Sequence, residues 1–561
     1  MIPVATVLKL LNGSLADALL TARMPPPDKY SKVALGVAAS LSVGLPLGLW
    51  AIKAPLPFTP LLLIPALFPA LLALMAYLPT LIAKMRASDI GVELPPFLVF
   101  MSTLSLVLAP LQAFERVARA PRYIFNEVRY EARRFLVETK FFGRDPLDAL
   151  SYIARTTPNK DLKATLEGYV ATVKGGSNPV DYLVRQAEFY LRRRVGEVRA
   201  AVENMVGLME SFVSIAIFTV VTLFSLGIAG EALPSLAGQM MPTMRVPREL
   251  MTVSYTFPLL MAVMFLVMAK GMQPRAPIGE YRQYKVAAPA HVLALLALPL
   301  TQAMAWLGWT AMPLATALAL LAASAIAAVG DVRWARFHAS VRKGFREFIN
   351  EMREMRRTGI APEKALEELS ARRYGAFTKY VRELNDSIKH NRPLREYMDE
   401  MAGEVRDWLV IPLMYVLVST LEVGGMTPEV LDRYANYVDS LFLVEEEKRA
   451  RMKVLRVLPF VTAIIQFFTI YAIMYIFDSL LISMGRVSIL EMSGPLIFTL
   501  LTLTNYVYGL VAGLLSEERL SAGFKYSAAL MLVTLVMLLL GEQLVGALFT
   551  AVGGGAPRMG G

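Results

Sequence analysis

The chain contains no cysteine and only three histidines, His291, His338 and His390, which lie far apart in the sequence. Without cysteine there can be no disulfide, thiolate metal site or cysteine nucleophile. The wide spacing of the histidines argues against a histidine metal cluster. The phosphate-binding pattern GxxxxGK[ST] is also missing from the chain. We therefore expect no cofactor, no metal, no catalytic residue and no ATP hydrolysis by this chain itself, so that it is not an enzyme.

Charged residues make up only 18% of the 561 residues, whereas 55% are hydrophobic and the mean hydropathy is +0.49. This composition is too apolar for a soluble globular protein and is typical of a polytopic membrane protein. The formal net charge is +11. An excess of Lys and Arg can indicate nucleic-acid binding, but in a membrane protein it more often marks the segments kept on the cytoplasmic side. We therefore expect no nucleic-acid partner.

Nine stretches are apolar over the roughly 20 residues that a helix needs to cross a membrane. They are residues 33–52, 58–82, 205–230, 250–269, 288–307, 312–330, 456–482, 494–515 and 526–549. Two long charged segments interrupt this series, and together they hold about three quarters of the Lys and Arg residues. Because each charge at the bilayer centre costs several kcal/mol, neither segment lies in the membrane. Four predicted spans separate the segments, so both face the same side.

The short loops on that side are also the more basic ones, as Lys270, Arg275, Arg282 and Lys285 illustrate. By the positive-inside rule, the amino terminus and both charged segments are cytoplasmic, and nine spans place the carboxyl terminus outside. The predicted organisation is a cytoplasmic tail (1–30), two spans (31–83), a first helical module (84–204), four spans (205–330), a second helical module (331–455), three spans (456–549) and a flexible tail (550–561).

Both modules carry the sequence signals of short helices. Asp145-Pro146, Asn178-Pro179, Thr157-Pro158 and Thr427-Pro428 each place a capping side chain before a proline, which suits a first helical turn. Apolar residues then recur at helical spacing, which predicts bundles of about six short antiparallel helices.

The two modules can be aligned on each other at offsets between about 247 and 252 residues. The matching landmarks are Ala109-Pro110 with Ala361-Pro362, Arg144–Leu147 with Asn391–Leu394, Lys174–Gly176 with Val423–Gly425, and Tyr182-Leu183 with Val430-Leu431. A nearly constant offset indicates a duplicated unit. The paired glycines precede proline-started helices and are interpreted as tight links between helices, not as phosphate loops.

The candidate partner-binding residues are basic doublets and one acid: Arg133, Arg134, Arg356, Arg357, Arg372, Arg373 and Glu422. Arginine doublets can face solvent, contact anionic lipid or bind an acidic protein. Glu422 can contact a partner or pair with a nearby arginine. For Arg192–Arg194, at a predicted membrane entry, we favour anionic lipid. Acids near the ends of spans, Glu210, Asp478 and Glu542, leave a transport role open.

The second module resembles the F domain of type II secretion systems. The similarity rests on Gly359-Ile360, Ala365-Leu366, Pro393-Leu394, Glu422–Gly425 and Leu431–Tyr434. The first module resembles a divergent copy of the same domain. It lacks the glutamate, because Thr172–Lys174 precede its glycine pair. Two F domains in one chain, with two spans before the first and four between them, resemble the archaeal platform proteins of type IV pili and archaella. The resemblance implies an all-α membrane protein.

The resemblance also implies a role. A platform protein sits in the cytoplasmic membrane, docks a separate hexameric secretion ATPase on its cytoplasmic domains and moves pilin subunits into a filament. A homodimer is one expected state of assembly. The alternative is a polytopic transporter with cytoplasmic regulatory domains, which would need polar or broken helices at the membrane midplane. A signalling receptor would need a sizeable outer sensor, and the predicted outer loops are short.

Overall fold

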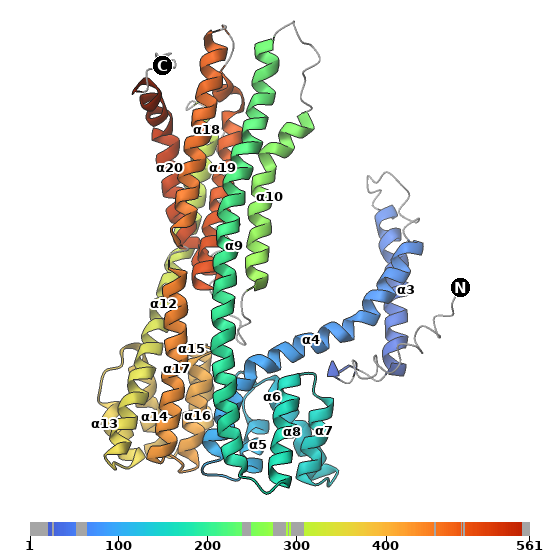
Figure 1. Ribbon diagram of the computed structural model, residues 1–561, viewed down its shortest axis with the longest axis vertical. Helices are drawn as coiled ribbons and strands as arrows, with labels where there is room; N and C mark the ends of the chain where they lie inside the picture. Colours follow the sequence, from blue (N-terminus) through green and yellow to red (C-terminus); the bar gives the residue numbers. More distant parts are fainter. Residues whose placement is uncertain are drawn as a thin grey trace.

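The computed structural model describes residues 19, 21–24, 27–51, 64–237, 248–272, 288–289, 291–292, 308–453, 456–483, 485 and 488–551. These residues form helices and turns, and no strand occurs among them. The described helices divide into a group of long helices and, beyond one end of it, two bundles of mostly short helices, while α3 (Pro27–Ala51) and the first part of α4 (Ile64–Leu104) stand to one side (Figure 1). The protein is an all-α membrane protein, as the sequence predicts.

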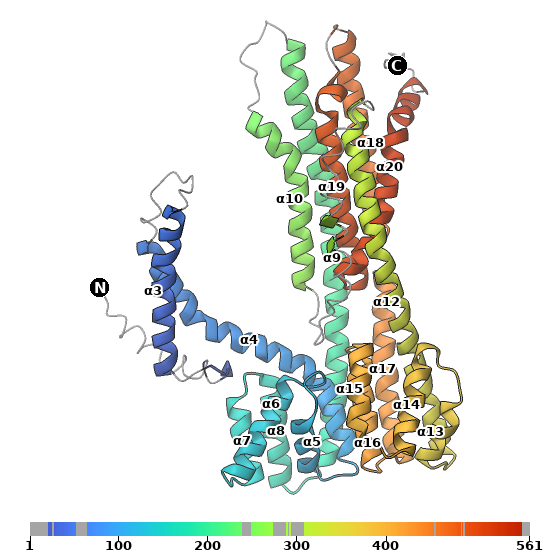
Figure 2. The same cartoon turned by 180° about the vertical axis from the view of Figure 1, so that it is seen from behind.

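Six long helices run side by side (Figures 1 and 2). They are α9 (Pro179–Ala237), α10 (Arg248–Met272), α12 (Ala311–Arg357), α18 (Leu458–Ser483), α19 (Ile489–Glu517) and α20 (Leu520–Ala551). We call them the long-helix group. Helices α9 and α12 continue without a break out of this group into the two bundles. The predicted boundaries at 205 and 331 therefore fall inside continuous helices, because helical hydrogen bonding persists where the side chains change from apolar to charged.

Six helices in the described part of the chain are long and apolar enough to cross a membrane, whereas the sequence predicts nine spans over the whole chain. The six are Leu71–Leu104 and helices α9, α12, α18, α19 and α20. Helix α3 (Pro27–Ala51) covers the first predicted span but is not among the six. The part of α10 described in full, Thr256–Gly271, is one of the shorter apolar helices. Most of the predicted span 288–307 lies outside the described residues, as do most of the predicted tails 1–30 and 550–561.

The first bundle begins in α4 (Ile64–Leu104), which runs through the predicted boundary at residue 84. Its further elements are α5 (Pro110–Arg119), α6 (Glu127–Leu136), the π-helical turn η2 (Val137–Phe141), α7 (Pro146–Thr156), α8 (Lys160–Lys174) and the start of α9. The second bundle contains the end of α12, then α13 (Pro362–Ser370), the 3-10 turn η5 (Gly375–Phe377), α14 (Thr378–Lys389), α15 (Leu394–Val405), α16 (Val410–Glu422) and α17 (Pro428–Met452).

Three of the four predicted capping residues, Asp145, Asn178 and Thr427, cap a helix. Asp145 accepts a hydrogen bond from the Leu147 amide at 2.9 Å, and Thr427 accepts one from Val430 at 3.3 Å, in each case before a proline-started helix. The prediction for Thr157-Pro158 is wrong, since Thr157 closes α7 and α8 begins only at Lys160. The nearby Asn159 caps α8 instead.

The turns of the two bundles correspond at a constant offset of 248 residues. Gly143 and Asn391 both have positive φ, and so do Gly176 and Gly424. After α8, the Ser177 amide donates to the Thr172 carbonyl, and after α16 the Gly425 amide donates to Thr420, again 248 residues on. This pattern closes the end of a helix through a left-handed residue. The sequence alignment of the glycine pairs is therefore one residue out of register, because the left-handed position is the second glycine of one pair and the first of the other.

The two bundles share one apolar core. Phe100 of α4 stacks on Tyr415 of α16 with ring centroids 5.5 Å apart, and both rings contact Phe125. Gly425 lies so close to the first bundle that a Cβ there would come within 2.6 Å of Val107. The bundles are thus joined by side-chain packing and not only by the chain that connects them.

Candidate functional site

The end of the bundles furthest from the long-helix group is formed by the turns that close each helical pair (Figure 1). We call this end the distal face. It includes the end of α12 at Gly359, the α8–α9 turn, the α16–α17 turn and the turn that leads into α7. Lys174 Nζ lies 3.5 Å from Asp148 Oδ1, which places the start of α7 beside the end of α8. A partner that docks end-on to the bundles would meet these turns.

The candidate arginines of the second bundle contact its own helices. Arg356 donates from Nε to the Met426 carbonyl at 2.8 Å and from Nη1 to the Ile360 carbonyl, so it ties the α12–α13 turn to the α16–α17 turn. Arg357 pairs with Asp432 at 2.9 Å. The pKa of Arg357 is raised by its hydrogen bond to Asp432, which favours the charged form.

Arg372 pairs with Glu351 at 2.9 Å, and its neighbour Arg373 is exposed and forms no ion pair within the described residues. Glu422 pairs with Arg116 of the first bundle at 3.0 Å, which is the intramolecular alternative that the sequence left open. Tyr123 donates to Asp399 at 2.6 Å beside this contact between the bundles.

The candidate doublet of the first bundle also fastens helices together. Arg133 donates from Nε to the Ala118 carbonyl at 3.0 Å, and Arg134 binds Glu131 and Thr156, both at 2.7 Å. The structure therefore brings Arg356, Arg357 and Glu422 to the distal face but does not gather all seven candidates into one patch. Their role in partner binding stays a prediction.

An exposed aromatic pair on the distal face escaped the sequence reasoning. Phe141 is 82% exposed and Phe142 is 63% exposed, with ring centroids 5.3 Å apart. They end the π-helical turn η2, beside the exposed Val137. The signal was available in the sequence as two consecutive aromatic residues between Lys140 and Gly143, at a point where a helix must stop. Exposed apolar clusters of this kind mark interaction surfaces.

Asp407 joins α16 to α12 at the opposite end of the second bundle. Its fully buried carboxylate accepts from Arg342 Nε at 2.7 Å and lies 3.2 Å from His338 Nδ1. It also caps α16 by accepting from the Leu409 and Val410 amides. Burial alone would raise the pKa of Asp407, but Arg342 and His338 outweigh it and hold this pKa well below its usual range.

The first bundle has a neutral equivalent at the same place. Asn159, 248 residues before Asp407, caps α8 through the Leu162 amide at 2.8 Å and donates to the Ala87 carbonyl of α4 at 2.7 Å. In both bundles one capping side chain therefore fixes the start of a short helix to the long helix that enters the bundle.

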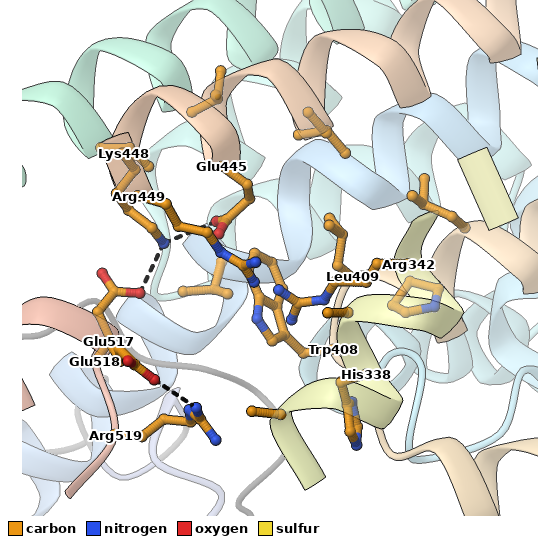
Figure 3. Close-up of a pocket in the computed structure, with 18 of the residues that line it drawn as sticks. His338, Arg342, Trp408, Leu409, Glu445, Lys448, Arg449, Glu517, Glu518 and Arg519 are labelled. Atoms are coloured by element: carbon orange, nitrogen blue, oxygen red, sulfur yellow. Dashed lines mark hydrogen bonds and ion pairs between the residues drawn. The ribbon is translucent and has the colours of Figure 1, made fainter. Parts of the chain in front are cut away.

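A charged network connects α17 to the turn between α19 and α20 (Figure 3). Lys448 lies 2.7 Å from Glu518 and 2.9 Å from Glu445. Burial would lower the pKa of Lys448, but the two carboxylates raise it further than burial lowers it, so the net shift is upward. Arg519 bonds to the buried Asp331 at 2.9 Å. The second bundle is thus attached electrostatically to the ends of two long helices.

No cluster of three or more His, Asp or Glu side chains suited to a metal ion occurs among the residues that the structure describes. Asp407 and Lys448, whose pKa values are shifted, belong to ion pairs between helices. The arrangement offers docking surfaces and rigid connections.

A scan against protein families matches residues 348–475 to the type II secretion system (T2SS), protein F. Searches of the curated proteins and of the solved structures each found no match. The matched range begins in the last part of α12, covers the second bundle and ends within α18. It therefore includes both the bundle and its helical connection to the long-helix group. The matched range covers less than a quarter of the chain and identifies a domain similar to protein F of type II secretion systems.

Proposed function

We propose that the protein is the platform of a type IV pilus-like assembly machine of the archaeal kind, with two F domains. In this role the two bundles are cytoplasmic and dock a hexameric secretion ATPase. The long-helix group lies in the cytoplasmic membrane, where pilin subunits pass it on their way into the filament. The observation that carries the proposal is the F-family match over the bundle together with its attached membrane helix.

The way in which the bundles are joined supports a role in passing on mechanical work. The shared core prevents the two bundles from moving independently, because separating them would expose rings such as Phe100 and Tyr415 to water. Helices α9 and α12 then continue from the bundles into the long-helix group. A partner that moves the bundles would therefore move the membrane helices as well.

The distal face is the proposed ATPase contact. It is the surface furthest from the membrane helices, and it presents the aromatic pair Phe141 and Phe142 among charged side chains. Aromatic anchors surrounded by polar residues are typical of protein–protein interfaces. Arg357 and Glu422 lie on the same face, and their exposed ion pairs are weak enough to exchange for a partner.

The test is capture of the cognate secretion ATPase by the detergent-solubilised full-length protein. Replacing Phe141 and Phe142 together by serine is expected to weaken capture at least tenfold, since interface aromatic anchors often contribute about 2 kcal/mol. Phe189→Ser is the matched control, because this ring is 52% exposed on α9, away from the distal face. Full capture by the double variant would contradict the assignment of this face, and failure of the wild-type protein to capture the ATPase would contradict the proposed function.

A further inference from the structure

A cavity of about 980 Å³ lies where the two bundles meet the long-helix group. Its walls come from α4, α9 and α12, from the start of α16, from α17 and from the α19–α20 turn. Figure 3 shows side chains from α12, from the start of α16, from α17 and from the α19–α20 turn gathered around the same space. The volume is at the upper end of the range typical of sites for small molecules and cofactors. The cavity is distinct from the distal face, which lies at the other end of the bundles.

The lining of the cavity is strongly basic. Ten Lys or Arg residues line it, against six Asp or Glu residues. The acidic groups are used within the protein: Glu445 and Glu518 bind Lys448, and Glu517 binds Lys525 at 2.6 Å. The excess of cations in a partly enclosed space creates a positive potential that favours an anion.

One lining cation that is not neutralised lies on α17. Arg449 forms no hydrogen bond or ion pair in the part of the chain that the structure describes, although its side chain lines the cavity. Figure 3 shows Arg449 and Arg342 converging beside the indole of Trp408. Burial lowers the pKa of Arg449, and the neighbouring Arg342 lowers it further, which is the effect of one cation facing another. An anion between the two guanidinium groups would relieve this repulsion.

The chemistry of the two arginines selects the kind of anion. A guanidinium group has planar donors that match the oxygens of a phosphate, and two of them can hold one phosphate group. An inorganic phosphate alone is far too small to fill a cavity of this volume. The rest of the lining includes apolar side chains, among them Pro412, Leu441 and Met452, which suit the hydrocarbon part of a larger ligand.

The position of the cavity indicates where such a ligand comes from. Two lining residues adjoin candidate membrane spans: Glu517 is the last residue of α19, and Arg456 lies two residues before the start of α18. The cavity is therefore at the level where lipid headgroups meet the protein.

We propose that this cavity binds an anionic phospholipid, with the lipid phosphate between Arg342 and Arg449 and the first part of its acyl chains against the apolar wall. Arg194, one of the arginines Arg192–Arg194 predicted to contact anionic lipid, also lines this cavity. The bound lipid would fill the junction between the two bundles and the membrane helices.

Trp334 and Trp408 line the cavity and are two of the five tryptophans in the chain, so their fluorescence can report binding. The detergent-solubilised full-length protein is titrated with dihexanoyl phosphatidylglycerol. Dihexanoyl phosphatidylcholine, inorganic phosphate and ADP are titrated separately. We expect a saturable change with phosphatidylglycerol that Trp408→Phe diminishes. Binding should weaken about fivefold in Arg449→Gln and about thirtyfold in Arg449→Glu, at about 1 kcal/mol for each unit of charge.

Arg451→Gln is the matched control, since Arg451 lies on the same helix, is exposed and pairs with Glu447 outside the cavity. Size-exclusion profiles establish that each variant is folded. Equal phosphatidylglycerol binding by the wild-type protein and both Arg449 variants would overturn the proposal, as would the absence of any saturable change. Binding of ADP or phosphate that depends on Arg449, without binding of the lipid, would overturn the assignment to a lipid and point to a soluble phosphate ester.

Discussion

Replacing Asp407 separates two contributions that this side chain makes to the second bundle. Asp407→Asn can still cap α16, as Asn159 caps α8 in the first bundle, but it cannot neutralise Arg342. Asp407→Ala loses both functions. Breaking a buried ion pair by removing one partner costs about 3–5 kcal/mol. The cap contributes about 1 kcal/mol of this total, so Asp407→Asn should cost about 2–4 kcal/mol.

The assay is the thermal unfolding of the full-length protein in detergent, followed by tryptophan fluorescence. The apparent melting temperature should fall in the order wild type, Asp407→Asn, Asp407→Ala. The reasoning is refuted if Asp407→Asn melts like the wild type, because the buried charge would then contribute nothing. It also fails if the two variants melt at the same temperature, since the asparagine would then provide no cap.

The same residue predicts a dependence on pH. The pKa of Asp407 in the folded state is depressed below the value of about 3.9 expected for the unfolded chain. A depressed pKa gives stability that is fully present above the unfolded pKa and is lost as the pH falls through the folded one. The difference in melting temperature between the wild type and Asp407→Asn should therefore be constant above about pH 5 and narrow below about pH 4. A gap that widens on acidification would contradict the sign of this shift.

Three further predictions concern the joints of the fold. Gly424 has φ +70°, so Gly424→Ala should lower stability by about 1 kcal/mol in thermal unfolding, and a neutral effect would argue against a left-handed turn there. Gly513 of α19 lies so close to the backbone of Gly523 of α20 that a Cβ at residue 513 would not fit without a shift of the helices. Gly513→Leu should therefore impair folding of the protein in detergent. A normal size-exclusion profile of this variant would contradict the packing. Arg116→Glu and Glu422→Arg should each change the free energy of unfolding by less than about 1 kcal/mol, because both side chains are 37% exposed and water screens their charges. The double variant, which restores the pair in reverse, should recover part of the loss in a double-mutant cycle. A larger loss from either single variant would show that water does not screen the pair.

The sequence was sufficient for the helical class and for many local boundaries. Proline at 110, 146, 179, 362 and 428 begins a helix in each case, because these signals act within one turn and need no information about the rest of the fold. Hydropathy also located most of the long apolar helices. It could not locate where α4, α9 and α12 end, since a helix continues through a change from apolar to charged side chains.

The contacts of the candidate site depend on tertiary structure. Arg356 looks like a solvent-exposed arginine in the sequence, but the α16–α17 turn, 70 residues away, supplies the carbonyl to which it binds. Which cations of the cavity remain available to an anion likewise depends on the carboxylates that the fold places beside them. Glu518 neutralises Lys448 across 70 residues, whereas Arg449, the next residue, is left unpaired among the described residues. No local pattern distinguishes these two adjacent cations.

Helix α9 contains 59 residues and so extends about 88 Å at 1.5 Å per residue. Its first turns are held in the first bundle by Tyr182 and Tyr190, which donate to carbonyls of α8, while its last turns belong to the long-helix group. A rod of this length converts a small angular change at its base into a large sideways motion at its tip. Rocking the bundles by about 5° would sweep the opposite end through about 8 Å, close to the spacing between neighbouring helices.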